Sequence, residues 1–192
     1  MNIFILCGAH DGTVISKLDQ VTSRGVYGPD ISWDAIHLFE PQPFHRQSLE
    51  TLRNKDTRCI YHPAGVSNVA GTFQFFVKGD IGNCSSTLDP YKSTGRLKET
   101  IQVQVVDFIQ WLRENTSPTD FVVIDMDIEC EEYKVLPTLI TSDIVDRIKW
   151  ISVEFHQNKS THWAKDSKDL LIEQEVRKFF GDKFLDHNTY FG

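Results

Sequence analysis

Five short runs of apolar residues, each followed by a glycine, a proline or an ionisable residue, decide the fold class of this chain. They occupy residues 3–7, 35–39, 59–62, 121–126 and 148–155. Runs of this length with no polar face are typical of strands in a parallel sheet, because helices cover both faces of such a sheet. The runs therefore predict a buried, mostly parallel sheet.

Between these runs, apolar residues recur at helical spacing. The periodicity predicts helices over 13–23, 43–54 and 168–180, a helix that Asp107 caps, and one after residue 126 that Pro137 should kink or shorten. In the helix over 168–180 we expect the inward side chains to be Ile172, Val176, Phe179 and Phe180. Residues 183–191 are predicted to form a last strand. Alternating strands and helices with short connections imply a doubly wound α/β fold.

Two segments have another pattern. Residues 72–77 and 101–105 alternate between apolar and polar, which is typical of half-buried antiparallel strands. Residues 79–95 between them are rich in small polar side chains and are predicted to form a long loop, either a lid over a substrate or a plain hairpin loop. The prediction is thus one domain over 1–192, with a Rossmann-like, mostly parallel sheet and an inserted antiparallel β-hairpin.

Composition excludes several classes of protein. The net charge of −7 argues against nucleic-acid binding, which needs clustered Lys and Arg. No apolar run approaches the length of a membrane span, and the start of the chain is predicted to be a strand rather than a signal peptide. The four cysteines have no C-x-x-C spacing, so we expect buried free thiols and a cytoplasmic protein. Oligomeric state is left open.

Polar residues gather where the predicted strands end. Ligands of doubly wound sheets bind outside the carboxyl ends of the strands, so these residues are candidates for a site. They are the loop Gly8-Ala9-His10-Asp11-Gly12, Glu40, the group Asp125, Asp127 and Glu129, and the pair Glu154 and His156.

The loop after the first strand and Glu40 together predict a nucleoside-binding site. Glycines at a strand–helix junction let a ligand approach backbone N–H groups, and an acidic residue after the second strand can accept hydrogen bonds from ribose hydroxyls. The spacing is not G-x-G-x-x-G, which disfavours a dinucleotide dehydrogenase. The alternatives are a tight strand–helix turn and a solvated turn carboxylate.

The acidic group after the fourth strand has two interpretations. Asp125, Asp127 and Glu129 share one face if the strand stays extended to residue 129, and they could then bind a hard cation. The D-x-D pattern also occurs in metal-dependent glycosyl transferases, which makes Asp125 and Asp127 candidate ligands. Alternatively, the glutamates form the first turn of a helix, the role that we assign to Glu131. Asp127 points into the site in both cases, and His156 is either a proton acceptor or a structural histidine.

In order and spacing, these stretches resemble the FkbM family of S-adenosylmethionine-dependent methyltransferases. The first motif and the F-E-P-x-P motif of that family are similar to Cys7-Gly-Ala-His-Asp-Gly-Thr-Val14 and His37-Leu-Phe-Glu-Pro-Gln-Pro43. Further matches are Ala64-Gly-Val-Ser67, Gly71-Thr-Phe73, Ser85-Ser86, Val105-Val-Asp107, Asp127-Ile-Glu-Cys-Glu-Glu-Tyr133 and Val153-Glu-Phe-His156.

The resemblance implies a methyltransferase-type Rossmann-like fold and S-adenosylmethionine as methyl donor. No residue is assigned as a metal ligand in this interpretation. The resemblance also implies O-methylation of a hydroxyl on a sugar or another small molecule. By motif position, the methionine part of the cofactor lies at Gly8, Ala9, His10 and Gly12, the ribose at Glu40 and Pro41, and the adenine near Gly65, Val66 and Ser67. Asp127, Glu129 or His156 would take the proton of the acceptor hydroxyl. We expect residues 79–95 and 157–167 to select the acceptor molecule.

Four residues depart from the family pattern. Cys7 stands where the family usually has Asp, His10 where Asn is common, Asp125 in place of a Lys and Cys130 in place of a Gly. These departures motivate a further hypothesis, a non-catalytic binding module with the same fold. The glycosyl transferase and the binding module are the alternatives to the methyltransferase.

Overall fold

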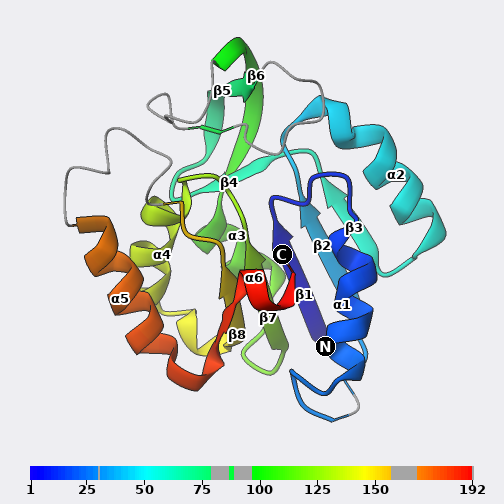
Figure 1. The fold of residues 1–192 in the computed structure, drawn as a ribbon, viewed down its shortest axis with the longest axis vertical. Helices are drawn as coiled ribbons and strands as arrows, with labels where there is room; N and C mark the ends of the chain where they lie inside the picture. The colour runs from blue at the N-terminus through cyan, green and yellow to red at the C-terminus, as the bar shows by residue number, and fades with distance from the viewer. Residues whose placement is uncertain (30, 79–86, 89–96, 157–167, 192) are drawn as a thin grey trace.

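The main sheet of the protein has six strands, all parallel, in the order β3-β2-β1-β7-β8-β9 (Figure 1). The computed structural model describes residues 1–29, 31–78, 87–88, 97–156 and 168–191. The strands are β1 (Asn2–Cys7), β2 (Ala35–Phe39), β3 (Cys59–His62), β7 (Phe121–Met126), β8 (Ile148–Val153) and β9 (Phe184–Asp186). The predicted α/β class and parallel sheet are confirmed.

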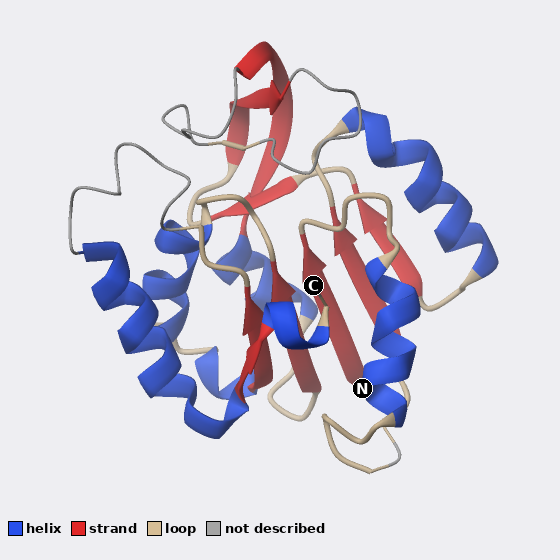
Figure 2. Cartoon of the chain, viewed as in Figure 1, coloured by secondary structure: helices blue, strands red, loops and turns tan. Residues whose placement is uncertain are grey.

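Helices cover both faces of this sheet (Figure 2). Along β1, Ile3 and Ile5 pack into one core with α3 and α4, whereas Phe4 and Leu6 pack into a second core with α1. This alternation follows from the strand geometry, in which successive side chains point to opposite faces. The helices are α1 (Val14–Ser23), α2 (Arg46–Lys55), α3 (Phe108–Asn115), α4 (Glu132–Ile140), α5 (Lys168–Phe180) and α6 (His187–Tyr190), with short 3₁₀ turns at Pro43–His45, Val145–Arg147 and Gly181–Lys183.

The structure confirms the predicted helix cap, and it shows that the helix containing the proline does not end there. Asp107 caps α3, because its side chain accepts a hydrogen bond from the backbone N–H of Gln110 at 3.0 Å. Helix α4 passes through Pro137 and continues to Ile140. Among the helices of the described residues, none is long and apolar enough to cross a membrane.

A second, three-stranded sheet lies beyond the carboxyl ends of the main-sheet strands (Figure 1). It contains β4 (Gly65–Ser67), β5 (Gly71–Lys78) and β6 (Leu97–Asp107) in the order β4-β6-β5. Strands β5 and β6 are antiparallel, which confirms the inserted hairpin, and β4 pairs with β6 in parallel. Strand β4 was not predicted, because three residues are too few to establish a period. Residues 157–167, and all of the predicted loop except its residues 87–88, lie outside the described residues.

At the carboxyl end of the chain, the predicted last strand is present but shorter than expected, and one inward side chain was predicted wrongly. Residues 183–191 form the three-residue strand β9 and then α6, whose first turn Asp186 caps by accepting a hydrogen bond from the backbone N–H of Thr189. Phe179 is 50% exposed, because Phe180 takes the core position four residues after Val176 and Phe179 lies about 100° from it around the helix.

Candidate active site

An open cleft of about 600 Å³ lies between the two sheets, at the carboxyl ends of β1, β2 and β7. Eight of the predicted site residues line it, namely Gly8, His10, Glu40, Pro41, Gly65, Val66, Asp127 and Glu129. Ala9, Gly12, Ser67 and His156 lie outside the lining. The parallel topology brings these separate segments together, because every strand of the sheet points towards this edge.

The loop after β1 is held by its own backbone. The N–H groups of Gly8 and Ala9 both donate to the carbonyl of Phe39, at 3.0 and 2.9 Å. Gly8 has a φ of +89°, and a Cβ on it would lie 1.9 Å from the backbone oxygen of Asp127. Gly12 has a φ of +85° and packs against the side chain of Leu52. Gly8 thus sets how closely the β1 and β7 loops approach, and Gly12 how closely α2 approaches.

Glu40 is buried with both carboxylate oxygens already oriented. Oε2 accepts a hydrogen bond from the backbone N–H of His10 at 2.9 Å, and Oε1 accepts one from that of Gln42 at 2.8 Å. Burial raises the pKa of Glu40 to about 7, although these hydrogen bonds act to lower it. Each oxygen of the ionised group keeps a second lone pair for a ligand hydroxyl.

Glu131 has a different role from the one predicted. It lines the cleft and is only 3% exposed, where a plain first-turn glutamate would lie in solvent. Its Oε1 accepts a hydrogen bond from the hydroxyl of Ser67 at 2.5 Å, and Lys134 pairs with its Oε2 at 2.8 Å. Glu131 therefore joins β4 to the start of α4, and its charge is neutralised by Lys134.

The acidic segment after β7 does not stay extended. The strand ends at Met126, and Glu129 and Cys130 have φ values of +55° and +88°. The two aspartates lie before this turn and have different surroundings. Asp127 lines the cleft, whereas Asp125 is fully buried and outside the lining, with its Oδ1 2.8 Å from Nδ1 of His187. Burial raises the pKa of Asp125, although its contact with His187 acts to lower it.

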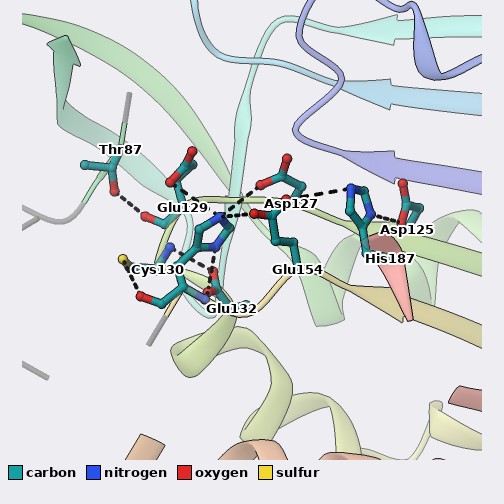
Figure 3. Close-up of polar contacts among 9 residues, drawn as sticks. Thr87, Asp125, Asp127, Glu129, Cys130, Glu132, Glu154 and His187 are labelled. Atoms are coloured by element: carbon teal, nitrogen blue, oxygen red, sulfur yellow. Dashed lines mark hydrogen bonds and ion pairs between the residues drawn. The ribbon is translucent and has the colours of Figure 1, made fainter. Parts of the chain in front are cut away.

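His156 lies fully buried behind the cleft wall, surrounded by carboxylates. Its Nε2 is 3.3 Å from Asp127 Oδ1, 3.5 Å from Glu129 Oε2 and 3.5 Å from Glu154 Oε1. Figure 3 shows Asp127 and Glu154 between Glu129 on one side and His187 with Asp125 on the other. Burial lowers the pKa of His156, but the neighbouring carboxylates outweigh burial and raise this pKa to about 11.

Glu132 orients His156 from the side away from the cleft. This glutamate is 0% exposed. Its Oε1 accepts hydrogen bonds from the backbone N–H of His156 at 2.8 Å and from Nδ1 at 2.9 Å, and its Oε2 accepts one from the backbone N–H of Cys130 at 2.8 Å. Three donors thus meet one buried carboxylate.

Several residues of this region escaped the sequence prediction. The further cleft-lining residues are Phe39, Gln42, His45, Phe75, Leu88, Ile128 and Glu131. Three of them, Phe39, Gln42 and His45, lie within or just after the F-E-P-x-P match, so their position beside Glu40 was a usable signal. No signal in the sequence pointed to His187, because its partner Asp125 is 62 residues away along the chain.

Comparison with known proteins decides the family. The profile described as the Methyltransferase FkbM domain matches residues 7–188. The chain belongs to the FkbM methyltransferase family. Members of this family use S-adenosylmethionine as the methyl donor. A search of curated proteins found no match.

A solved structure agrees with the fold of this FkbM domain. The crystal structure of methyltransferase FkbM from Methylobacillus flagellatus KT is similar, with a TM-score of 0.54 and 16% sequence identity. The similarity covers 93% of this chain and 37% of that chain, so the domain spans little more than a third of the solved protein's length. At this identity the likeness concerns the fold.

The backbone conformation at Cys130 favours glycine. With a φ of +88°, a residue with a side chain is strained there by about 1 kcal/mol or more. We expect Cys130→Gly to be at least as stable as Cys130→Ala, although glycine removes more of the side chain. At an ordinary position glycine is about 0.5–1 kcal/mol less stable than alanine. Urea unfolding of both variants tests this, and the ordinary order would contradict it.

Proposed function

We propose that this chain transfers the methyl group of S-adenosylmethionine to a hydroxyl of a sugar or another small molecule. The observation that carries the proposal is that Glu40 and Asp127 face the same cleft, at the sheet edge where doubly wound folds bind their ligands. Family membership supports the reaction class, and the acidic cleft suits a small acceptor better than a nucleic acid.

The cleft fits the cofactor at both of its ends. The Glu40 carboxylate is held by two backbone N–H groups and keeps lone pairs for two ribose hydroxyls. Pro41, Gly65 and Val66 form a mostly apolar wall suited to a base. Asp127 and Glu129 add negative charge to the lining of the same cleft, where it would favour a sulfonium. When bound, S-adenosylmethionine supplies an electrophilic methyl group.

The carboxylates of Asp127 and Glu129 are the proposed acceptors of the hydroxyl proton, because both line the cleft. His156 has a pKa of about 11 and so keeps its proton at neutral pH. Its imidazolium stabilises the neighbouring carboxylates and does not itself take the proton. Most of the rate would come from positioning the acceptor against the methyl group.

The glycosyl transferase alternative loses its basis, because Asp125 does not reach the cleft and the family is one of methyltransferases. The cytoplasm remains the proposed compartment. Within the described residues, Cys7, Cys59 and Cys130 are free and buried, as a reducing environment would keep them.

Calorimetry with S-adenosylhomocysteine tests the cofactor site. We expect Glu40→Gln to weaken binding at least about tenfold, because the amide cannot accept hydrogen bonds at both positions. As a control, Asp127→Asn should bind within a few-fold of the wild type but transfer no methyl group to any hydroxyl compound. Binding without transfer by the wild-type chain would support a non-catalytic module, and no binding at millimolar ligand would contradict the proposal.

The pKa of Glu40 predicts how this binding depends on pH. Below a pH of about 7 the Glu40 carboxyl is protonated, and one of its oxygens becomes a donor. The two ribose hydroxyls need two acceptor oxygens here. The affinity for S-adenosylhomocysteine should therefore rise as pH increases through about 7 and level off by pH 8. Glu40→Gln should remove this rise. A wild-type affinity that stays constant from pH 6 to pH 8 would show that Glu40 does not hold the ribose as a carboxylate.

A further inference from the structure

Three side chains at the wall of the cleft have the spacing of a cation site. Asp127, Glu129 and His156 each offer one ligand atom, and the three atoms lie within 4.8 Å of one another. Nε2 of His156 is 3.3 Å from the Asp127 oxygen and 3.5 Å from the Glu129 oxygen. Neighbouring ligands about 2.1 Å from an octahedral ion are about 3.0 Å apart, so small shifts of these side chains would let them share one ion.

The buried imidazole provides an independent indication. The side chain of His156 is 0% exposed, yet its Nε2 makes no hydrogen bond. The carboxylate oxygens that face Nε2 stand beyond the 2.7–2.9 Å of a charge-assisted hydrogen bond. Its other nitrogen, Nδ1, lies 2.9 Å from Glu132. A metal-ligating histidine has this same arrangement, with a carboxylate fixing the far nitrogen and the near nitrogen turned to the ion.

The excess of negative charge in this region also favours a bound cation. Five carboxylates, Asp125, Asp127, Glu129, Glu132 and Glu154, surround two imidazoles, His156 and His187 (Figure 3). Even with both imidazoles protonated, the carboxylates outnumber the positive charges. A divalent ion would offset this excess where the cleft meets the buried cluster.

We propose that Asp127, Glu129 and His156 bind a divalent cation of the Mn²⁺ or Mg²⁺ type. Two carboxylates favour a hard ion, and the single imidazole favours Mn²⁺ over Mg²⁺. Three protein ligands leave positions open to the cleft. The role of the ion rests on the proposed function: with the ion bound, Asp127 and Glu129 would act as its ligands and would no longer accept the hydroxyl proton themselves. The ion would hold the acceptor oxygen and lower the pKa of that hydroxyl, and the proton would pass to solvent. On Nε2 the cation replaces a proton, so the two compete for one lone pair.

Mn²⁺ binding to the whole chain, followed by electron paramagnetic resonance of the free ion, tests the site without cofactor or acceptor. We expect about one ion per chain, and at least about tenfold weaker binding for Asp127→Asn, Glu129→Gln and His156→Gln. Asp143→Asn is the matched control, because Asp143 is an exposed carboxylate paired with Arg113 far from the cleft. Circular dichroism identifies the variants that fold. If His156→Gln does not fold, Asp127→Asn carries the test, because Asp127 is the most exposed of the three ligands.

Two results would overturn the cation site. One is no Mn²⁺ bound to the folded wild type at millimolar ion, which would leave the His156 proton as the permanent occupant. The other is equal weakening by Asp143→Asn, which would mark non-specific binding. Failure of the proposed function is distinguishable, because it would appear as lost S-adenosylhomocysteine binding while Mn²⁺ still binds. Methyl transfer that stops with a chelator and returns with Mn²⁺ would support both.

Discussion

Gly8→Ala is expected to destabilise the fold by about 3 kcal/mol, a large fraction of the roughly 5–15 kcal/mol that stabilise a typical domain. The added Cβ would lie 1.9 Å from the backbone oxygen of Asp127, and backbone atoms cannot swing aside as a flexible side chain does. Hydrogen bonds also hold the two loops in place, since the N–H of Gly8 donates to the carbonyl of Phe39 and the N–H of Asp127 donates to the carbonyl of Cys7. Relief of the clash would therefore break hydrogen bonds between β1, β2 and the β7 loop.

Gly25→Ala is the matched control for this prediction. Gly25 has a φ of +73°, similar to that of Gly8, but a Cβ there would meet nothing within 4 Å. Its substitution should cost only the backbone strain, about 1 kcal/mol. The difference between the two variants in urea unfolding isolates the collision with Asp127. Equal losses would show that the loops can separate without cost.

Glu132→Ala is expected to cost about 3–5 kcal/mol, because it leaves buried donors and a buried cation without their acceptor. The backbone N–H groups of Cys130 and His156 and the Nδ1 of His156 would all lose their partner. Without Glu132 the pKa of His156 should also fall, since this carboxylate is one of those that raise it. The free energy of urea unfolding and the NMR titration of His156 measure the two effects.

Glu173→Ala is the control for the loss of an ion pair alone. Glu173 pairs with Arg177 at 2.9 Å on the partly exposed surface of α5, and such pairs contribute about 0–1 kcal/mol. Glu132→Gln keeps the size of the side chain but turns an amide donor towards backbone donors, so we expect it to recover only part of the loss. A cost for Glu132→Ala no larger than that of Glu173→Ala would contradict the assigned role.

These two substitutions act on opposite sides of the same turn. Gly8 determines where the backbone of Asp127 lies, and Glu132 determines where the imidazole behind Asp127 lies. The proposed proton acceptor is thus positioned by one steric contact and one buried hydrogen-bond network. Neither Gly8 nor Glu132 needs to touch an acceptor molecule to affect methyl transfer.

The sequence sufficed for five strands of the main sheet and for eight of the residues that line the cleft. Apolar runs such as 121–126 predict buried strands, because the period of burial is a property of consecutive residues. A parallel sheet brings all strand ends to one edge, so Glu40 and Asp127 could be placed in one site before their distance was known. The resemblance to the FkbM family added the cofactor and the place of Gly65 and Val66.

Only the tertiary structure decided the roles within the segment from Asp125 to Glu132. Acidic residues that lie close together in this segment have different partners: Asp125 contacts His187, Glu131 contacts Ser67, and Glu132 contacts His156. These partners lie 62, 64 and 24 residues away along the chain. A local pattern carries no information about such pairs, because they arise from packing between elements. The sequence alone determined that carboxylates collect at the end of β7. The fold determined which of these carboxylates face the cleft, because the backbone turns at Glu129 and Cys130, where φ is positive, and the side chains before and after the turn pack against different elements.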